Sequence, residues 1–367
     1  MLPIASPLMR PWIPRALTAA MLAVAGCSHT GGTAPAPAAA PRTNANGEVL
    51  VSPDNFVRAE SDTYFGRIVA DDGFGRFHHV RNMNPDGTQR VIRQNRDTLY
   101  SAAVFDLDAG PVTITLPDAG TRFRSLQILD EDEYTHNVVY DKGEITLTKA
   151  GIGTRYVAAA MRILVNPNDP HDIDAVHRLQ DGTTVKQDKP GSFEVPKWDP
   201  DSQKLVRDSL RTLASTLPNL DGMFGSRAST DPVHHLIGAA SGWGGNPRTD
   251  ATYLAEAPPK NDGVTLYRLT VGQVPVDGFW SVTVYNHQGF VQPNPQNAYA
   301  VNNLTAVKGP DGRTAIQFGG CPADGARDVK VPDCLPITPG WNYMVRLYRP
   351  QAALLDGSWK FPHAMPV

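Results

Sequence analysis

Apolar and polar residues alternate along a first stretch of the chain, residues 98 to 165, with the period of two that is typical of β-strands. Val112, Ile114 and Leu116 alternate with two threonines there, and turn sequences such as LPDAG and DKGE separate the apolar runs. Short strands joined by tight turns favour antiparallel pairing. The pattern therefore predicts an antiparallel β-sandwich.

The apolar period changes to that of helices after residue 168. Three Asp-Pro pairs, at 169–170, 199–200 and 231–232, each precede such a pattern. An aspartate before a helix accepts hydrogen bonds from the first-turn amides, and proline at the first helical position gives up no donor that the helix needs. We expect the second of these helices to bury one face, formed by Val206, Leu210, Leu213 and Leu217.

A second set of alternating runs begins at residue 264, where Trp280, Val282 and Val284 are spaced to share one face of a strand. The order of strands, helices and strands predicts a mainly β protein with two antiparallel β-sandwich domains and a helical segment between them. We place the N-terminal sandwich at residues 51–168, the helical segment at 169–258 and the C-terminal sandwich at 259–367.

Residues 1–26 have the features of a bacterial export signal. They contain Arg10 and Arg15, no acid, and a short apolar run that ends before Cys27. The run is shorter than the roughly 20 apolar residues that span a bilayer, so we expect a removable signal peptide.

The sequence VAGC around Cys27 resembles a lipobox, which predicts lipidation of this cysteine and anchoring to a membrane through its acyl chains. A plain secretory signal is the alternative. Residues 27–50 are rich in Ala, Pro, Gly and Thr, and are expected to form a flexible tether. Ser28, rather than an aspartate, follows the cysteine, and by resemblance to known sorting rules this favours the outer membrane of a Gram-negative bacterium.

Charge and nucleotide motifs exclude some classes of partner. The chain has 34 basic and 37 acidic residues and a net charge of −3, which becomes −5 if the leader with its two arginines is removed. So mild a charge argues against nucleic acid as a partner. The chain has no P-loop and no complete dinucleotide-binding motif, so no cofactor is expected.

Cys321 and Cys334 are two of the three cysteines and are 13 residues apart. Outside the cytosol such a pair tends to oxidise. Zinc is the alternative, but it normally takes four ligands, and no histidine lies between or beside these cysteines. We therefore expect a disulfide and no metal site.

Several long motifs carry a resemblance to a known family. They are NRDTLYSAAVFDL (95–107), GTRYV (153–157), DPVHHLIGAASGWGGNP (231–247), VPVDGFWSVTVYN (274–286) and the region from FGGC to LDGSWKFP (318–362). Together they resemble the paired domains of unknown function 1254 and 1214 over roughly residues 60 to 367. The resemblance implies an immunoglobulin-like N-terminal sandwich, a helical part and a jelly-roll-like C-terminal sandwich. It implies no activity, although a similar disulfide occurs in one branch of the family.

A first candidate site lies at Asn95, Asp97 and Tyr100, where a polar loop enters a strand. These side chains could hydrogen-bond a ligand, but a turn held by Asn and Asp side chains explains them equally simply.

A second candidate site lies on the C-terminal sheet, where Tyr285 and Arg346 are spaced to face away from the apolar stripes. An aromatic ring beside an arginine suits carbohydrate or carboxylate recognition, whereas a buried arginine bonded to carbonyls is the structural alternative.

A third candidate lies in the last helical region, at His234, His235 and Trp243. Neighbouring helical residues diverge by about 100°, so the two histidines are poorly placed to share a metal. Either could act as a general base, and Trp243 could cover a flat ligand or fill the seam between domains. This helix is expected to bury Val233, Leu236, Ile237 and Ala240, with His235 pointing away from them.

Four acids in a row, residues 130–133, are expected to form a solvated turn rather than a calcium loop, because their spacing is not that of a calcium-binding motif.

Three functions remain open from the sequence. The first is an envelope lipoprotein that binds a small polar ligand or glycan. The second is a hydrolase with its site at the helical seam, near His234, His235 and Asp97. The third is a structural or assembly protein that could act as a homo-oligomer. No catalytic residue is assigned.

Overall fold

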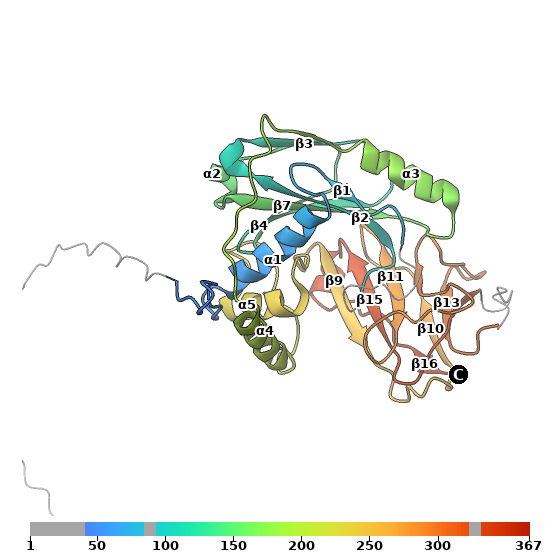
Figure 1. Cartoon of the computed structure of the whole chain (residues 1–367). Coiled ribbons are helices and arrows are strands. Elements are labelled where there is room, and N and C mark those ends of the chain that lie inside the picture. Colours follow the sequence, from blue (N-terminus) through green and yellow to red (C-terminus); the bar gives the residue numbers. More distant parts are fainter. Residues whose placement is uncertain (1–40, 84–92, 323–331) are drawn as a thin grey trace, which may run out of the picture. The chain divides into compact units, whose positions relative to one another are not determined.

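Alternating apolar residues fold into two layered β-sheet units, as the sequence pattern predicts (Figure 1). The computed structural model describes residues 41–83, 93–322 and 332–367. The leader and Cys27 lie outside these residues. The mainly β architecture with antiparallel sheets and an intervening group of helices is confirmed. No helix of the described ranges is long and apolar enough to cross a bilayer.

The N-terminal unit pairs a five-stranded sheet with a three-stranded one, both antiparallel. The larger sheet has the order β1 (His78–His79), β2 (Thr98–Asp106), β7 (Tyr156–Leu164), β4 (Arg124–Asp130) and β5 (Thr135–Val139). The smaller has the order β6 (Gly143–Leu147), β3 (Val112–Leu116) and β8 (Thr184–Lys186). One face of each sheet supplies a shared apolar core that includes Phe105, Ile114 and Met161.

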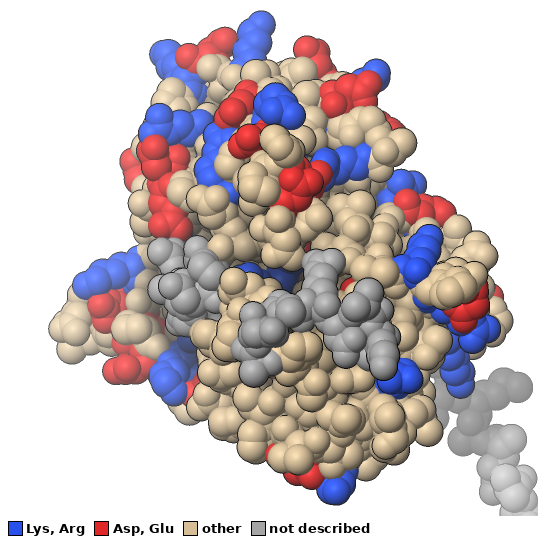
Figure 2. All heavy atoms as spheres, turned by 90° about the vertical axis from the view of Figure 1, so that its right-hand side faces the viewer, with Lys and Arg blue, Asp and Glu red and all other residues tan. Residues whose placement is uncertain are grey.

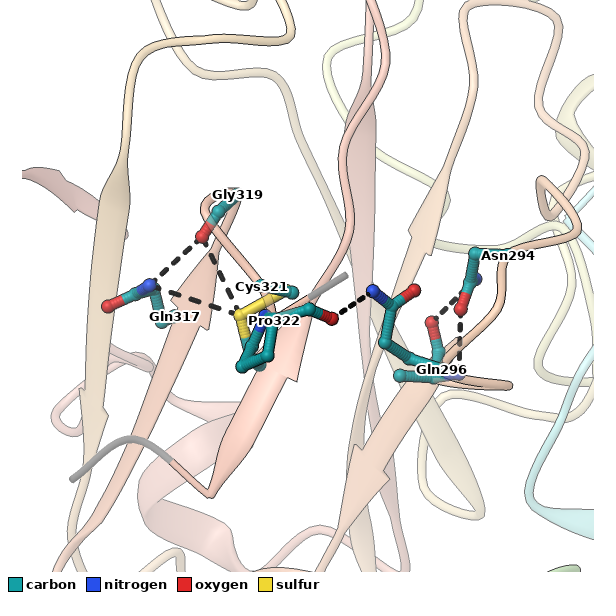
Figure 3. Close-up of a disulfide and its surroundings, with 8 residues drawn as sticks. Asn294, Gln296, Gln317, Gly319, Cys321 and Pro322 are labelled. Carbon is teal, nitrogen blue, oxygen red and sulfur yellow. Dashed lines mark hydrogen bonds between the residues drawn. A yellow bond between two sulfur atoms is a disulfide. The ribbon is translucent and has the colours of Figure 1, made fainter. Parts of the chain in front are cut away.

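The C-terminal unit packs two four-stranded sheets over an aromatic core that includes Phe318, Trp341 and Tyr343. One sheet has the order β12 (Ala300–Asn302), β11 (Trp280–Tyr285), β15 (Asn342–Tyr348) and β9 (Ala251–Glu256). The other has the order β14 (Asp333–Leu335), β13 (Thr314–Phe318), β10 (Tyr267–Val271) and β16 (Met365–Pro366), and only the β13–β14 pair is parallel. The predicted disulfide joins Cys321 to Cys334, with their Cα atoms 5.6 Å apart (Figure 3).

The three predicted Asp-Pro helices are present as α3 (Pro170–Asp181), α4 (Pro200–Ala214) and α5 (Pro232–Gly242), and each aspartate side chain accepts a hydrogen bond from a first-turn amide. Two further short helices are α2 (Lys149–Ile152) and α6 (Ala352–Leu355), and a 3-10 turn spans Leu107–Ala109. The predicted face of α4 is wrong at Leu213, which is 51 % exposed. Leu210 is buried as predicted, and Gln203, which was not predicted, is buried with it because the contact face of α4 is partly polar.

Helix α1 (Phe56–Ala70) is a further element, which the sequence pattern does not predict. It buries Phe56 and Phe65 together with the polar run Glu60-Ser61-Asp62, so no continuous apolar stripe marks it. With α4 and α5 it forms a helical layer, and α1 packs on β2 (Figure 1). The helices thus cover part of the face of the five-stranded sheet that points away from the N-terminal core.

The last residues of the predicted tether are held by backbone hydrogen bonds. The Val49 N–H donates to the Lys197 carbonyl and the Asp199 N–H donates to the Val49 carbonyl, both at 2.8 Å. The Asn44 amide also donates to Asp199 Oδ1 at 2.8 Å. Residues 43–50 therefore lie against the segment that leads into α4.

Candidate functional site

Two arginine–tyrosine pairs, one from each sandwich, border the same cavity. In the N-terminal unit Tyr100 on β2 lies directly opposite Arg162 on β7, and in the C-terminal unit Tyr253 on β9 lies directly opposite Arg346 on β15. The strand period of two explains their position, because the neighbours of each arginine along its strand point into a sandwich core. The same alternation therefore directs both arginines towards the space between the units.

The cavity has a volume of about 420 Å³. We call it the cationic cavity. It is lined by Val80, Arg93, Gln94, Asn95, Tyr100, Arg162, Trp243, Tyr253, Met344, Arg346 and Tyr348. None of these residues is an aspartate or a glutamate, so the polar groups around the cavity are amides, phenols and guanidinium groups.

Arg162 is buried and is held only by neutral acceptors among the described residues. Its Nη1 donates to Gln127 Oε1 at 2.9 Å and its Nη2 donates to the Gly244 carbonyl at 3.3 Å. Its guanidinium group lies 5.5 Å from the ring centre of Tyr100. Burial acts to lower the pKa of Arg162 and the surrounding phenols act to raise it, with a raised pKa as the result. The side chain is therefore a buried cation with N–H groups left over for a ligand.

Arg346 is fixed from behind by a second set of neutral groups. Its Nη1 donates to Thr283 Oγ1 at 3.0 Å, and its Nη2 donates to the Arg93 carbonyl and to the Tyr285 hydroxyl, both at 2.7 Å. The Tyr285 hydroxyl in turn donates to the Gln94 carbonyl at 2.9 Å. Tyr285 thus positions Arg346 and does not itself line the cavity.

The phenols of Tyr253 and Tyr348 each accept a hydrogen bond from an amide, and neither donates its own proton to another of the described residues. Asn246 donates to the Tyr253 hydroxyl and Asn95 donates to the Tyr348 hydroxyl, both at 2.9 Å. Burial raises the pKa of Tyr348 well above its usual value, so this phenol stays protonated. Both hydroxyls can therefore donate to a ligand atom that accepts hydrogen bonds.

Asn95 and Asp97 join the two sandwiches beside the cavity. Asn95 contacts Tyr348 as described, and Asp97 Oδ1 accepts a hydrogen bond from the Asn302 amide at 3.0 Å. Asp97 is fully buried, its Oδ2 has no hydrogen-bond partner among the described residues, and it does not line the cavity. Burial raises the pKa of Asp97, although the nearby Arg346 acts in the opposite direction. The aspartate is therefore a partial counter-charge for Arg346 rather than a ligand-facing group.

Trp243 closes one side of the cavity at the end of α5. Its ring stacks on Tyr64 with centroids 4.5 Å apart and planes 6° apart, and the edge of Phe65 completes its setting. The indole Nε1 donates to Ser61 Oγ at 3.0 Å. Helix α1 therefore fixes the orientation of Trp243. The sequence left two roles open for this residue, covering a flat ligand or filling the seam between domains.

Surface charge on one face of the molecule is mixed rather than of one sign. Figure 2 shows basic and acidic side chains intermixed over the upper part of that face and few charges in the middle of its lower part. Three arginines line the cavity, Arg93, Arg162 and Arg346, and the last two are buried. Such buried charge acts locally on a bound group, where screening by salt is weak.

The two histidines lie elsewhere and do not face the cavity. His235, predicted to point away from the buried side of α5, is only 4 % exposed, whereas Val233 is 61 % exposed. The prediction is wrong because α5 is exposed in its first turn and buried on most sides beyond it. His235 Nδ1 and Nε2 lie 2.9 Å from the carbonyl oxygens of Met223 and Asp132, and His234 Nδ1 lies 2.6 Å from the Asp221 carbonyl. Both ring nitrogens of His235 thus lie within hydrogen-bond distance of backbone carbonyl oxygens, so neither is free to act as a base.

The four consecutive acids are not a solvated turn, contrary to prediction. Asp130, Glu131 and Glu133 are at most 6 % exposed. Glu133 Oε1 accepts a hydrogen bond from the Gly244 amide at 2.8 Å, and burial raises its pKa to about 8. No group of three or more His, Cys, Asp or Glu side chains in the described ranges is arranged to hold a metal ion.

Four of the predicted binding residues thus line one cavity: Asn95, Tyr100, Trp243 and Arg346. Tyr285 and Asp97 support it from behind. The sequence reasoning missed Arg162, Tyr253 and Tyr348. A signal for Arg162 was present, because it is the one charged residue in the apolar strand sequence YVAAAMRIL.

Comparisons with known proteins match both halves of the chain. Residues 74–152 match the family model described as protein of unknown function DUF1254, and residues 252–352 match that described as protein of unknown function DUF1214. None of the curated proteins matches the chain.

Two solved structures resemble the fold. The VPA0106 protein from Vibrio parahaemolyticus has 18 % sequence identity and a TM-score of 0.65, over 86 % of this chain and 98 % of that one. An uncharacterised protein from Burkholderia cenocepacia has 14 % identity and a TM-score of 0.48, over 85 % and 86 % of the two chains. The first likeness shows the fold.

Proposed function

The chain belongs to the family of proteins that pair domains of unknown function 1254 and 1214, and from this premise we propose that it binds a small anionic ligand in the cationic cavity. The observation that carries the proposal is the pair of buried arginines, Arg162 and Arg346, which face one cavity from two different sandwiches. Neither has an ion pair with a carboxylate among the described residues.

The energetic argument concerns the cost of burying charge. A buried cation without a paired anion is expensive, and proteins normally pair it or avoid it. The buried Asp97 offsets at most one of the two charges, because it is a single carboxyl group and burial raises its pKa. A bound anion supplies the missing charge and accepts hydrogen bonds from the free guanidinium N–H groups and from the hydroxyls of Tyr253 and Tyr348.

The hydrogen-bonding groups favour a carboxylate-type head group over an uncharged glycan. Sugar hydroxyls need acceptors as well as donors, and the cavity offers mainly donors. The Asn95 carbonyl oxygen is already used, since it accepts from the Asp97 amide at 2.6 Å. An anion, which only accepts, fits this donor-rich lining.

The test is a titration of the purified protein with acetate, benzoate and inorganic phosphate at constant ionic strength, followed by thermal unfolding. At least one anion is expected to raise the melting temperature, because a ligand that binds only the folded state stabilises it. Arg162→Met should weaken this binding at least about tenfold. Arg268→Met, which removes an exposed arginine on β10, is the matched control. No shift with any anion, or equal binding by Arg162→Met, would overturn the proposal.

We propose in addition that the protein works in the cell envelope, anchored through acyl chains on Cys27. The disulfide between Cys321 and Cys334 supports this location, because such bonds persist in oxidising compartments and are rare in the cytosol. It lies in the C-terminal sandwich, where the Gly319 carbonyl oxygen is 3.6 Å from Cys334 Sγ (Figure 3). Mass spectrometry of the native protein should show an acylated Cys27 at the N-terminus. An intact leader peptide would refute the anchor.

A further inference from the structure

The cationic cavity combines its anion-binding groups with a flat apolar wall. Trp243 lines the cavity, one of its ring faces lies against Tyr64, and Phe65 meets the indole at an angle of 81°. The hydrogen bond from its Nε1 to Ser61 fixes the ring plane. A rigid, partly exposed indole face is a surface on which a planar group can stack.

The anion-binding group is hydrogen-bonded to the loop that carries the flat wall. Arg162 Nη2 donates to the carbonyl of Gly244, the residue directly after Trp243. Gln127 connects them a second time, because its Oε1 accepts from Arg162 and its Nε2 donates to the Gly245 carbonyl at 2.9 Å. The distance between the indole and the guanidinium group is therefore set by a short hydrogen-bonded loop.

The glycines of this loop allow the close approach. Gly244 has a φ of +77°, which side chains rarely adopt, and a Cβ atom on Gly245 would lie 2.5 Å from the ring of Phe224. Any larger residue at either position would displace the loop and with it Trp243. The backbone is thus shaped to place the indole beside Arg162.

From this juxtaposition, and resting on the proposed function, we infer that the ligand class is a planar aromatic carboxylate. Its ring would lie on Trp243 and its carboxylate would accept from Arg162, with Arg346 and the phenols of Tyr253 and Tyr348 as further donors. The remaining wall includes the side chains of Val80 and Met344, which suit an apolar body rather than a row of hydroxyls. The cavity volume of about 420 Å³ limits the ligand to a small molecule.

The experiment compares four probes in isothermal titrations of the whole protein: benzoate, cyclohexanecarboxylate, acetate and glucuronate. Benzoate and cyclohexanecarboxylate share charge and carbon number but differ in planarity. We expect benzoate to bind about three- to tenfold more tightly than cyclohexanecarboxylate, which is the range that ring stacking supplies. In Trp243→Leu this ratio should fall to about one, whereas Trp243→Phe should keep part of it.

Acetate separates failure of this inference from failure of the proposed function and from misfolding. If Trp243→Leu binds acetate like the parent protein, its cavity is intact and the loss of benzoate preference is specific. If all carboxylates bind in an Arg162-dependent way but benzoate shows no preference, or if glucuronate binds most tightly, the aromatic class is wrong and anion binding stands. If no probe binds, the proposed function fails as well.

Discussion

Two buried polar regions flank the loop at residues 243–246, and they handle charge in opposite ways. On one side the cationic cavity holds Arg162 and Arg346 without ion pairs to carboxylates among the described residues. On the other side lies what we call the acidic cluster, consisting of Glu60, Asp62, Asp130, Glu131 and Glu133. Gly244 connects the two, because its amide donates to Glu133 and its carbonyl accepts from Arg162.

Most side chains of the acidic cluster have hydrogen-bond partners within the protein. Arg207 pairs with Glu60 through two hydrogen bonds, and Gln203 donates to the same carboxylate at 2.7 Å. Asp62 accepts from the indole of Trp198 at 2.8 Å, and Glu131 accepts from the Tyr156 amide at 3.0 Å. The cationic cavity instead leaves donors facing open space. The difference separates a buried charge that organises the fold from one that is available to a ligand.

The largest effect is expected at Glu133, whose pKa is raised to about 8 from an ordinary value of 4.5 by burial. The unfolded chain releases this proton near pH 4.5 and the folded protein keeps it to about pH 8. The free energy of unfolding is therefore not reduced by Glu133 below pH 4.5. It falls as the pH rises towards 8, by up to about 1.4 kcal/mol per pH unit. Glu133→Gln should remove this loss, so its advantage in urea unfolding grows to several kcal/mol at pH 8.

The control for Glu133→Gln is Glu194→Gln, which removes the same formal charge from a side chain that is 72 % exposed. It should shift the unfolding curve equally little at pH 5 and at pH 8. A Glu133→Gln variant whose stability runs parallel to that of the parent protein across this range would show that the buried carboxyl group is ionised at neutral pH.

Arg207→Met should destabilise the protein by about 3 kcal/mol, because it leaves the Glu60 carboxylate buried without its cation. Urea unfolding at pH 7 measures the change. In the double variant Arg207→Met/Glu60→Gln most of the loss should be recovered, since the uncompensated charge is then absent. A loss below 1 kcal/mol in the single variant would mean that Gln203 alone satisfies the carboxylate.

Arg162→Met should change the free energy of unfolding by less than about 1 kcal/mol, the smallest effect of the series. Removal of a buried cation without a carboxylate partner offsets the loss of its hydrogen bonds to Gln127 and Gly244. The measurement is the same urea titration without added anions. A loss as large as that of Arg207→Met would place Arg162 among the groups that hold the fold and would weaken the distinction between the two regions.

Strand alternation made the sheets and part of the site predictable from the sequence. The side chains of Tyr343, Val345 and Leu347 enter the core, so Arg346 had to face the other way. The existence of the cavity was not predictable, because it depends on which faces of two sheets meet. No local pattern pairs Arg162 with Arg346, which are far apart in the chain and belong to different sandwiches.

The failures at α1 and at the four acids share one physical cause. A pattern of apolar and polar residues assigns polar groups to the surface, but Glu60, Asp62 and Glu133 are buried with raised pKa values or charged partners. His235 was misplaced for the same reason, since carbonyl oxygens of Met223 and Asp132 compensate its burial. Such compensation comes from residues distant in sequence, and periodicity does not report it.

Strand β9, at the edge of the C-terminal sheet, has a practical consequence for anyone who separates the two halves. It begins at Ala251, immediately after the helical layer, and contributes Tyr253 to the cavity while pairing with β15. A gene split at residue 259, the boundary expected from the sequence, would strip the second half of its edge strand and expose the backbone of β15 to aggregation. Splitting before residue 251 would keep that sheet whole, yet would still divide the arginines between two polypeptides.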